Sequence, residues 1–137
     1  MKPLQSAIEH RNHEFDTVRS YLNDYDFSLG GSWDYDRGSF DHALDEARKV
    51  WLRIPFVVTN GNIDSEGANT DAKIEIGRPY ILKHVYNEGL DHDASAATVG
   101  GLVNQFQSPV DPDAAIEAEW VERAEQSLRD IERDFPV

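Results

Sequence analysis

The sequence contains no cysteine, which removes several kinds of chemistry from this chain of 137 residues. Disulfides, thiolate metal sites and thiol nucleophiles are all excluded. A chain without cysteine is compatible with a reducing compartment, so we expect a cytoplasmic protein.

Long apolar runs are also lacking. No stretch approaches the ~18 apolar residues that a membrane-spanning helix needs. The first residues, MKPLQSAIEHRNHE, turn polar early and contain no apolar segment of the kind found in signal peptides. We therefore expect neither a membrane-spanning helix nor a secretory signal.

Basic residues are scarce, with 13 Lys and Arg against 26 Asp and Glu and a formal net charge of −13. Such a surface repels phosphate backbones and anionic lipids, so nucleic acid and membranes are poor candidate partners. A basic protein partner would be attracted to it, although solubility is the commoner reason for such a charge. A basic protein partner and a homodimer are the two partners that stay open.

Catalytic and nucleotide-binding motifs are missing as well. The sequence has no Walker A motif, GxGxxG, GxSxG, HExxH or EF-hand loop. We therefore expect no cofactor, and no catalytic residue can be assigned from a motif.

What the sequence does contain is enough apolar residues for a core: 39% are hydrophobic, including 3 Trp, 5 Tyr and 6 Phe. Composition and length are those of an ordinary globular domain. We expect residues 1–137 to form a single domain, since no linker or repeat divides them.

The middle of the chain is rich in strand-like sequence. Val50–Thr59 and Ile74–Asp93 are rich in β-branched, aliphatic and aromatic residues and are bounded by Gly, Asn and Asp. Pro55 cannot donate a ladder hydrogen bond, which favours an edge position or a bulge. The apolar residues that alternate along one face of the first segment are Val50, Leu52, Ile54, Phe56 and Val58.

Short turns join these segments to their neighbours, which predicts an antiparallel sheet. We expect four strands at Phe27–Tyr35, Phe40–Leu44, Val50–Thr59 and Lys73–Tyr86, the last kinked at Gly77–Pro79. A lead-in strand at Leu4–Glu9 is a further expectation. The polar run Asn60–Lys73 is predicted to be a loop, and residues 87–109 fit either a short broken helix or a loop.

Two helices flank the predicted strands. Asn12 is a good cap for a first helix that carries Phe15, Val18 and Leu22 at helical spacing. The second is expected to start within two residues of Pro112 and to bury Trp120, Ala124, Leu128 and Ile131 along one face. The predicted fold is α+β: a four-strand antiparallel meander with an N-terminal helix and a long C-terminal helix packed on the sheet.

A few basic residues lie among the apolar positions of the strands, and they define the candidate ligand site: Arg53, Arg78, Lys83 and His84. In an acidic chain they favour an anionic ligand, with aromatic residues as walls, in a pocket between sheet and helices. The predicted ligand-binding residues are Trp51, Arg53, Arg78, Tyr80, His84 and Tyr86. The alternative is that these cations neutralise helix carboxylates such as Glu117 or Glu122.

A metal site is a weaker candidate. His84, Asp91, His92 and Asp93 fall close together and include residue types that bind divalent metals. Their spacing matches no recognised metal motif, so we expect no metal there.

Four segments of the chain carry a resemblance to a known family: WDYDRGSFDHALD (33–45), VWLRIPF (50–56), IGRPYILKHVYNEGLD (76–91) and NQFQSPVDPDA (104–114). They span most of the sequence, which resembles the YugN-like family, small bacterial proteins of unknown function. The resemblance implies a bacterial cytoplasmic protein and carries over no catalytic residue.

Two hypotheses for function follow. The first is a non-catalytic binding or interaction module. The alternative is a small-molecule binding protein or enzyme with a pocket between sheet and helices. A solid core would support the first, whereas a deep cavity with Arg53 or His84 pointing into it would support the second.

Overall fold

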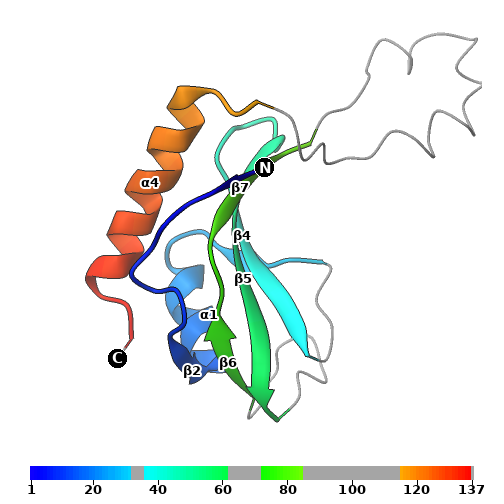
Figure 1. Cartoon of the computed structure of the whole chain (residues 1–137), viewed down its shortest axis with the longest axis vertical. Helices are drawn as coiled ribbons and strands as arrows, with labels where there is room; N and C mark the ends of the chain where they lie inside the picture. The colour runs from blue at the N-terminus through cyan, green and yellow to red at the C-terminus, as the bar shows by residue number, and fades with distance from the viewer. Residues whose placement is uncertain (32–35, 62–71, 85–114, 137) are drawn as a thin grey trace, which may run out of the picture.

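The structure is a computed structural model that describes residues 1–31, 36–61, 72–84 and 115–136. Figure 1 shows its elements. They are β1 (Lys2–Pro3), β2 (Asn12–Glu14), α1 (Phe15–Asn23), β3 (Ser28–Leu29), β4 (Arg37–Ala43), β5 (Val50–Asn60), β6 (Lys73–Ile76), β7 (Tyr80–Lys83) and α4 (Ala118–Arg133). Within the described residues, no helix is both long and apolar enough to cross a membrane.

The predicted antiparallel meander is confirmed. β3, β4 and β5 pair in succession, and β6 and β7 pair one after the other with the far side of β5. The N-terminal segment adds β1 outside β7 and β2 outside β6. The expected lead-in strand at Leu4–Glu9 is wrong. The strands β1 and β2 lie before and after this segment, and Leu4 and Ile8 within it are buried in the core.

Pro55 lies in the central strand rather than at an edge, so the edge alternative is wrong. The carbonyl oxygen of Pro55 accepts a hydrogen bond of 2.8 Å from the backbone N–H of Gly77. The N and C=O groups of one strand residue point to the same side. The missing N–H of Pro55 therefore faces residues 77–79, where the predicted kink separates β6 from β7.

The first helix starts later than its sequence suggests. Asn12, the expected cap, pairs with Glu75 as part of β2, and α1 begins at Phe15 with Glu14 in an extended conformation before it. The backbone N–H of Phe15 donates to the carbonyl of Ala72 at 2.9 Å. Asn12, which the sequence assigned to a helix cap, is therefore part of a strand that pairs with β6.

The C-terminal helix is present, but its expected start at Pro112 is wrong. Residues 115–117 are described and are not helical, and Glu117 is extended with φ −64° and ψ 148°. Helix α4 begins at Ala118. Its buried residues are Ala124, Leu128 and Ile131, whereas Trp120 is only half-buried.

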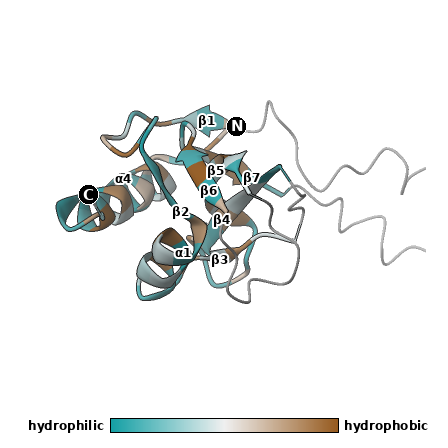
Figure 2. Ribbon diagram, turned by 90° about the horizontal axis from the view of Figure 1, so that it is seen from below, coloured by the Kyte–Doolittle hydropathy of each residue, from teal (hydrophilic) through white to brown (hydrophobic). Residues whose placement is uncertain are grey.

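Both helices lie on one face of the sheet, to the left of it in Figure 1. In Figure 2 the apolar sides of α1 and α4 face the strands. The side chains of α1, α4 and β4–β7 form one buried cluster there. At its centre are Phe15, Val18, Leu22, Phe40, Leu52, Ile54, Phe56, Ile74, Ile81, Leu128 and Ile131. This packing decides which strand residues are left for a site, because alternate residues point to the opposite face.

Candidate functional site

The face of the sheet that points away from the helices is the candidate site, and we call it the outer face. The strand register places its side chains in rows that cross β4, β5 and then β6 or β7. The rows are Arg37–Val57–Glu75, Ser39–Pro55, Asp41–Arg53–Tyr80 and Ala43–Trp51–Leu82. No helix covers these rows in the part of the chain that the structure describes.

A largely buried ion pair lies in the third row. The Nε and Nη2 atoms of Arg53 donate to Oδ1 and Oδ2 of Asp41 at 3.0 and 3.2 Å. Ser39 Oγ donates to the same Oδ1 at 2.9 Å. The exposed fractions of the two charged side chains are 25% for Arg53 and 12% for Asp41. Such a two-point contact has fixed geometry and is stronger than a single charged hydrogen bond.

Gly30 makes room for this pair. A Cβ atom at position 30 would lie 2.7 Å from Asp41 Oδ2 and 2.8 Å from Ser39 Oγ.

Burial alone would lower the pKa of Arg53, but hydrogen bonds to Asp41 and Tyr80 raise that pKa above its ordinary value. Arg53 is therefore a permanent cation whose principal donors are already engaged within the sheet.

The cations that the sequence singled out have internal partners. Arg53 pairs with Asp41 of a neighbouring strand, Arg78 Nε lies 3.1 Å from Glu9 Oε1, and Lys83 Nζ lies 2.6 Å from Glu117 Oε1. Lys83 does pair with Glu117 as expected, although Glu117 is extended and lies just before α4 rather than in it. For Arg53 the neutralising carboxylate comes from the sheet instead.

The structure brings together some of the predicted ligand-binding residues and separates others. Trp51, Arg53 and Tyr80 share the outer face, and the rings of Trp51 and His84 meet edge to face at 6.5 Å. Arg78 lies at the break between β6 and β7, and Tyr86 is outside the described residues. Core side chains fill the space between sheet and helices where the structure describes it, and the predicted pocket there stays a prediction.

The metal candidate cannot be placed. Asp91, His92 and Asp93 lie outside the described residues, as do most of the predicted loop Asn60–Lys73 and all of residues 87–109. Among the residues that are described, no group of three or more His, Asp or Glu side chains is arranged to hold a metal ion.

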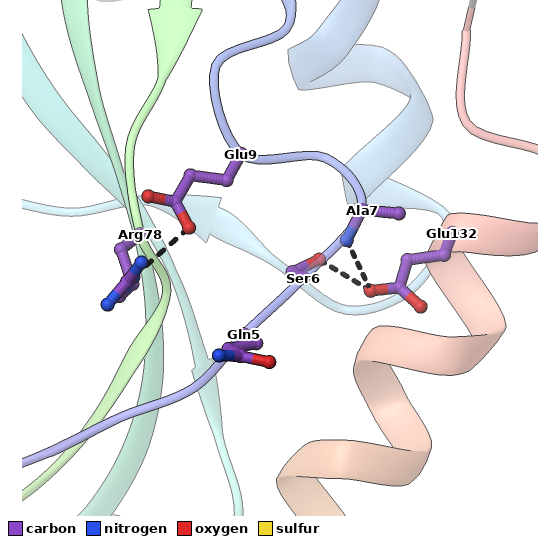
Figure 3. A pocket seen from close by; sticks show the side chains of 6 residues that line it. All are labelled: Gln5, Ser6, Ala7, Glu9, Arg78 and Glu132. Atoms are coloured by element: carbon purple, nitrogen blue, oxygen red, sulfur yellow. Dashed lines mark hydrogen bonds and ion pairs between the residues drawn. The ribbon is translucent and has the colours of Figure 1, made fainter.

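A polar depression of about 490 Å³ lies where the N-terminal segment meets Arg78 and α4 (Figure 3). Glu132 Oε2 accepts hydrogen bonds from Ser6 Oγ at 2.5 Å and from the backbone N–H of Ala7 at 3.1 Å. These bonds and the pair between Arg78 and Glu9 engage most of the polar groups that line it. The depression is a junction that fastens the N-terminal segment to the last turns of α4.

Sequence reasoning missed the outer-face residues of β4 and the exposed apolar side chain of β5. Val57 is 50% exposed, and apart from the chain-terminal Met1 it is the one large exposed hydrophobic residue among those described. Its row neighbours Arg37 and Glu75 are charged and have side-chain exposed fractions of 72% and 38%. The alternation along Val50–Thr59 does place Val57 on the face opposite Val50, Leu52, Ile54 and Phe56, but it does not mark Val57 as part of a site.

Comparison with known proteins places these features in context. A family model described as the YugN-like family matches residues 3–135. The "Uncharacterized protein YugN" of Bacillus subtilis (strain 168) is 28% identical over 133 residues, which are 96% of each chain. The crystal structure of the uncharacterized conserved protein YugN from Geobacillus kaustophilus HTA426 has a TM-score of 0.53 at 19% identity, with 98% of this chain and 100% of that chain covered. This structural likeness shows a shared fold.

Proposed function

We propose a function from the surface of this chain, since it belongs to the YugN-like family and both relatives described above are uncharacterized proteins. The proposed function is that of a non-catalytic binding module, which docks a protein through the outer face of its sheet. The observation that carries this proposal is Val57, an exposed apolar side chain on the central strand β5 that is paired with β4 on one side and with β6 on the other. Regular strands hold their side chains in fixed positions, which suits recognition by a preformed surface.

Half-buried side chains continue the surface around Val57. Pro55, Trp51 and Tyr80 extend along the same face, and the Arg53–Asp41 pair contributes no net charge to it. Aromatic residues and arginine are typical of the central part of protein interfaces. A solid core beneath the sheet supports a docking role over a buried reaction chamber.

The proposal extends to compartment and organisation. We propose a bacterial cytoplasmic protein in which residues 1–137 act as one domain. The absence of cysteine and the bacterial origin of both relatives support this part of the proposal.

Photo-cross-linking in cells tests the docking face. A photoreactive amino acid replaces Val57 in one variant and Arg129, an exposed residue on α4, in the control. We expect a cross-linked protein product from position 57 and none from position 129. Equal products at both positions, or none at position 57, would contradict the proposal.

A small anionic ligand is the second candidate, and one feature favours it. A depression of about 430 Å³ beside Trp51 is lined in part by the exposed cation Arg48. Trp51 Nε1 donates to the carbonyl of Arg48 at 2.8 Å, which places the indole next to that residue. A thermal-shift screen with inorganic phosphate and small carboxylates tests this, because a ligand that binds the native state raises its unfolding midpoint. A shift that persists in Arg48→Ala would exclude this depression as its source.

A further inference from the structure

We propose that the partner on the outer face is a second copy of this chain, held by Val57 against Val57 and by Arg37 against Glu75 of the other copy. This inference rests on the proposed function, since it names the occupant of the same face. It starts from one row of the sheet, in which Val57 on β5 lies between Arg37 on β4 and Glu75 on β6.

The order of the charges makes this row complementary to itself. A two-fold axis that runs along β5 lays β4 of one copy over β6 of the other, because these strands flank β5 on opposite sides. Arg37 of each copy then faces Glu75 of the other, and the two Val57 side chains meet at the axis. The same axis brings the two Arg53 side chains together, but each is already neutralised by Asp41 of its own copy. A two-fold axis across the strands through this row would instead place Arg37 over Arg37, which is repulsive.

The charge of the face favours a second copy over a basic protein. The four rows carry two cations, Arg37 and Arg53, and two carboxylates, Asp41 and Glu75, and the neighbouring Lys73–Glu14 pair on the same face is balanced as well, whereas the whole chain has a formal charge of −13. A basic partner would gain more from the acidic remainder of the surface. A balanced face lets two acidic molecules approach where their repulsion is smallest.

The two charged side chains of the row are free to re-pair. Arg37 Nε lies 3.5 Å from Asp36 Oδ1 and Glu75 Oε2 lies 3.3 Å from His10 Nδ1. The side chains of Arg37, Asp36 and His10 are each at least 67% exposed, so these contacts contribute little. Exchanging them for contacts across a drier interface loses almost no internal stability.

The size of the face predicts a weak dimer. Four rows about 6.7 Å apart on strands about 4.8 Å apart span roughly 20 by 15 Å, and the part open to a partner is smaller still, because Ser39, Asp41 and Leu82 in these rows are buried. That is smaller than the roughly 800 Å² per partner of a standard interface. We therefore expect a Kd on the order of 100 μM at low salt, which rises with ionic strength as the charge pairs are screened.

Sedimentation equilibrium on the purified full chain tests the dimer and its register. Val57→Asp should weaken association by about tenfold or more, and Arg37→Glu and Glu75→Arg should each weaken it by about tenfold. The double variant Arg37→Glu with Glu75→Arg restores opposite charges and should return the Kd to within about threefold of the unmodified chain. Arg129→Glu on α4 is the matched charge-reversal control and should leave the Kd unchanged, and circular dichroism melts confirm that each variant is folded.

The outcomes separate this inference from the proposed function. A chain that stays monomeric up to ~1 mM, a dimer indifferent to Val57→Asp, or a double variant without recovery would each overturn the dimer. The photo-cross-link at position 57 then decides the rest: a product with a different protein overturns the dimer and keeps the docking face, and no product overturns both. A product with the chain's own sequence, together with recovery in the double variant, supports both.

Discussion

Asp41 and Arg53 show at the residue scale how much a buried charge depends on its partner. Each is largely removed from water on a strand of the sheet, and each satisfies the other through two hydrogen bonds. Removing one partner leaves an uncompensated charge, whereas removing both leaves none.

We predict that Arg53→Met destabilises the protein by about 3 kcal/mol, because Asp41 then stays desolvated without its cation. The double variant Asp41→Asn with Arg53→Met should regain most of that loss. Urea titrations of the single and double variants measure the coupling. Arg129→Met, at an exposed position of α4, is the control and should change stability by less than about 0.5 kcal/mol.

This pair also marks where prediction from the sequence ends. The alternation of Val50, Leu52, Ile54 and Phe56 predicted one buried face of β5, and all four are buried. The partner of Arg53 was not predictable, since it depends on the register of β4 against β5. A shift of one residue would have placed a different side chain opposite Arg53.

At the scale of elements, α4 packs against the core through a narrow stripe of buried residues rather than through its tryptophan. Leu128 is 2% exposed and lies in the core cluster, whereas Trp120 only packs against its margin. The guanidinium of Arg123 lies 5.1 Å from the centre of the Trp120 ring, and its Nη1 donates to the carbonyl of Leu44 at 3.1 Å.

We predict that Leu128→Ala costs about 3 kcal/mol of unfolding free energy and Trp120→Ala only about 1–2 kcal/mol. Urea unfolding followed by far-ultraviolet circular dichroism provides both values. Glu122→Ala, at an exposed position of the same helix, serves as the control and should be close to neutral. An equal or larger loss for Trp120→Ala would show that the indole is a core residue.

The C-terminal end of α4 is fastened by an aromatic contact with β2 and α1. Phe135 is 4% exposed, and its ring lies 5.5 Å from that of His13 and 5.6 Å from that of Tyr21. Burial, followed by the nearby charge of Arg11, lowers the pKa of His13 below its ordinary value of 6.5, and a hydrogen bond to the Pro136 carbonyl only partly opposes this.

This contact predicts a dependence of stability on pH. A histidine with a lowered folded-state pKa takes up its proton more readily in the unfolded chain, so stability is full above pH 6.5 and is lost as the pH falls below it. We expect the difference in unfolding free energy between pH 7.5 and pH 5 to shrink in His13→Gln. His10→Gln is the control, at a side chain that is 74% exposed. An unchanged difference in His13→Gln would remove His13 as its source.

The start of α4 shows why local signals can mislead. The Asp111–Pro112 pair has the composition of a helix start, yet the helix begins at Ala118. Glu117 stays extended just before it and reaches Lys83 on β7. The residue just before the helix thus contacts a distant strand, and a local sequence pattern cannot predict such a contact.

For the whole molecule, the acidic surface predicts that nucleic acid does not bind. We predict no measurable binding to duplex DNA at physiological salt, because a formal charge of −13 repels a polyanion. A gel-shift assay up to ~10 μM protein checks this, with a basic DNA-binding protein as the positive control. Micromolar binding that weakens with salt would contradict the prediction.

The overall architecture was predictable where contacts are local and was missed where they are not. Hairpin turns and a clear apolar stripe predicted the meander and both helices. β1 and β2 were missed, because strands of two and three residues carry no periodic pattern. Their partners, β7 and β6, lie more than fifty residues further along the chain.

The junction between Ser6 and Glu132 has a consequence for synthesis. The two residues are 126 positions apart, so the N-terminal segment cannot form this contact until Glu132 has been synthesised. At about 5–20 residues per second, a ribosome needs roughly 7–27 s to make the 137 residues. During that time the nascent sheet lacks the cover of Ala124, Leu128 and Ile131, and this part of its apolar face is open to other chains until α4 has been made.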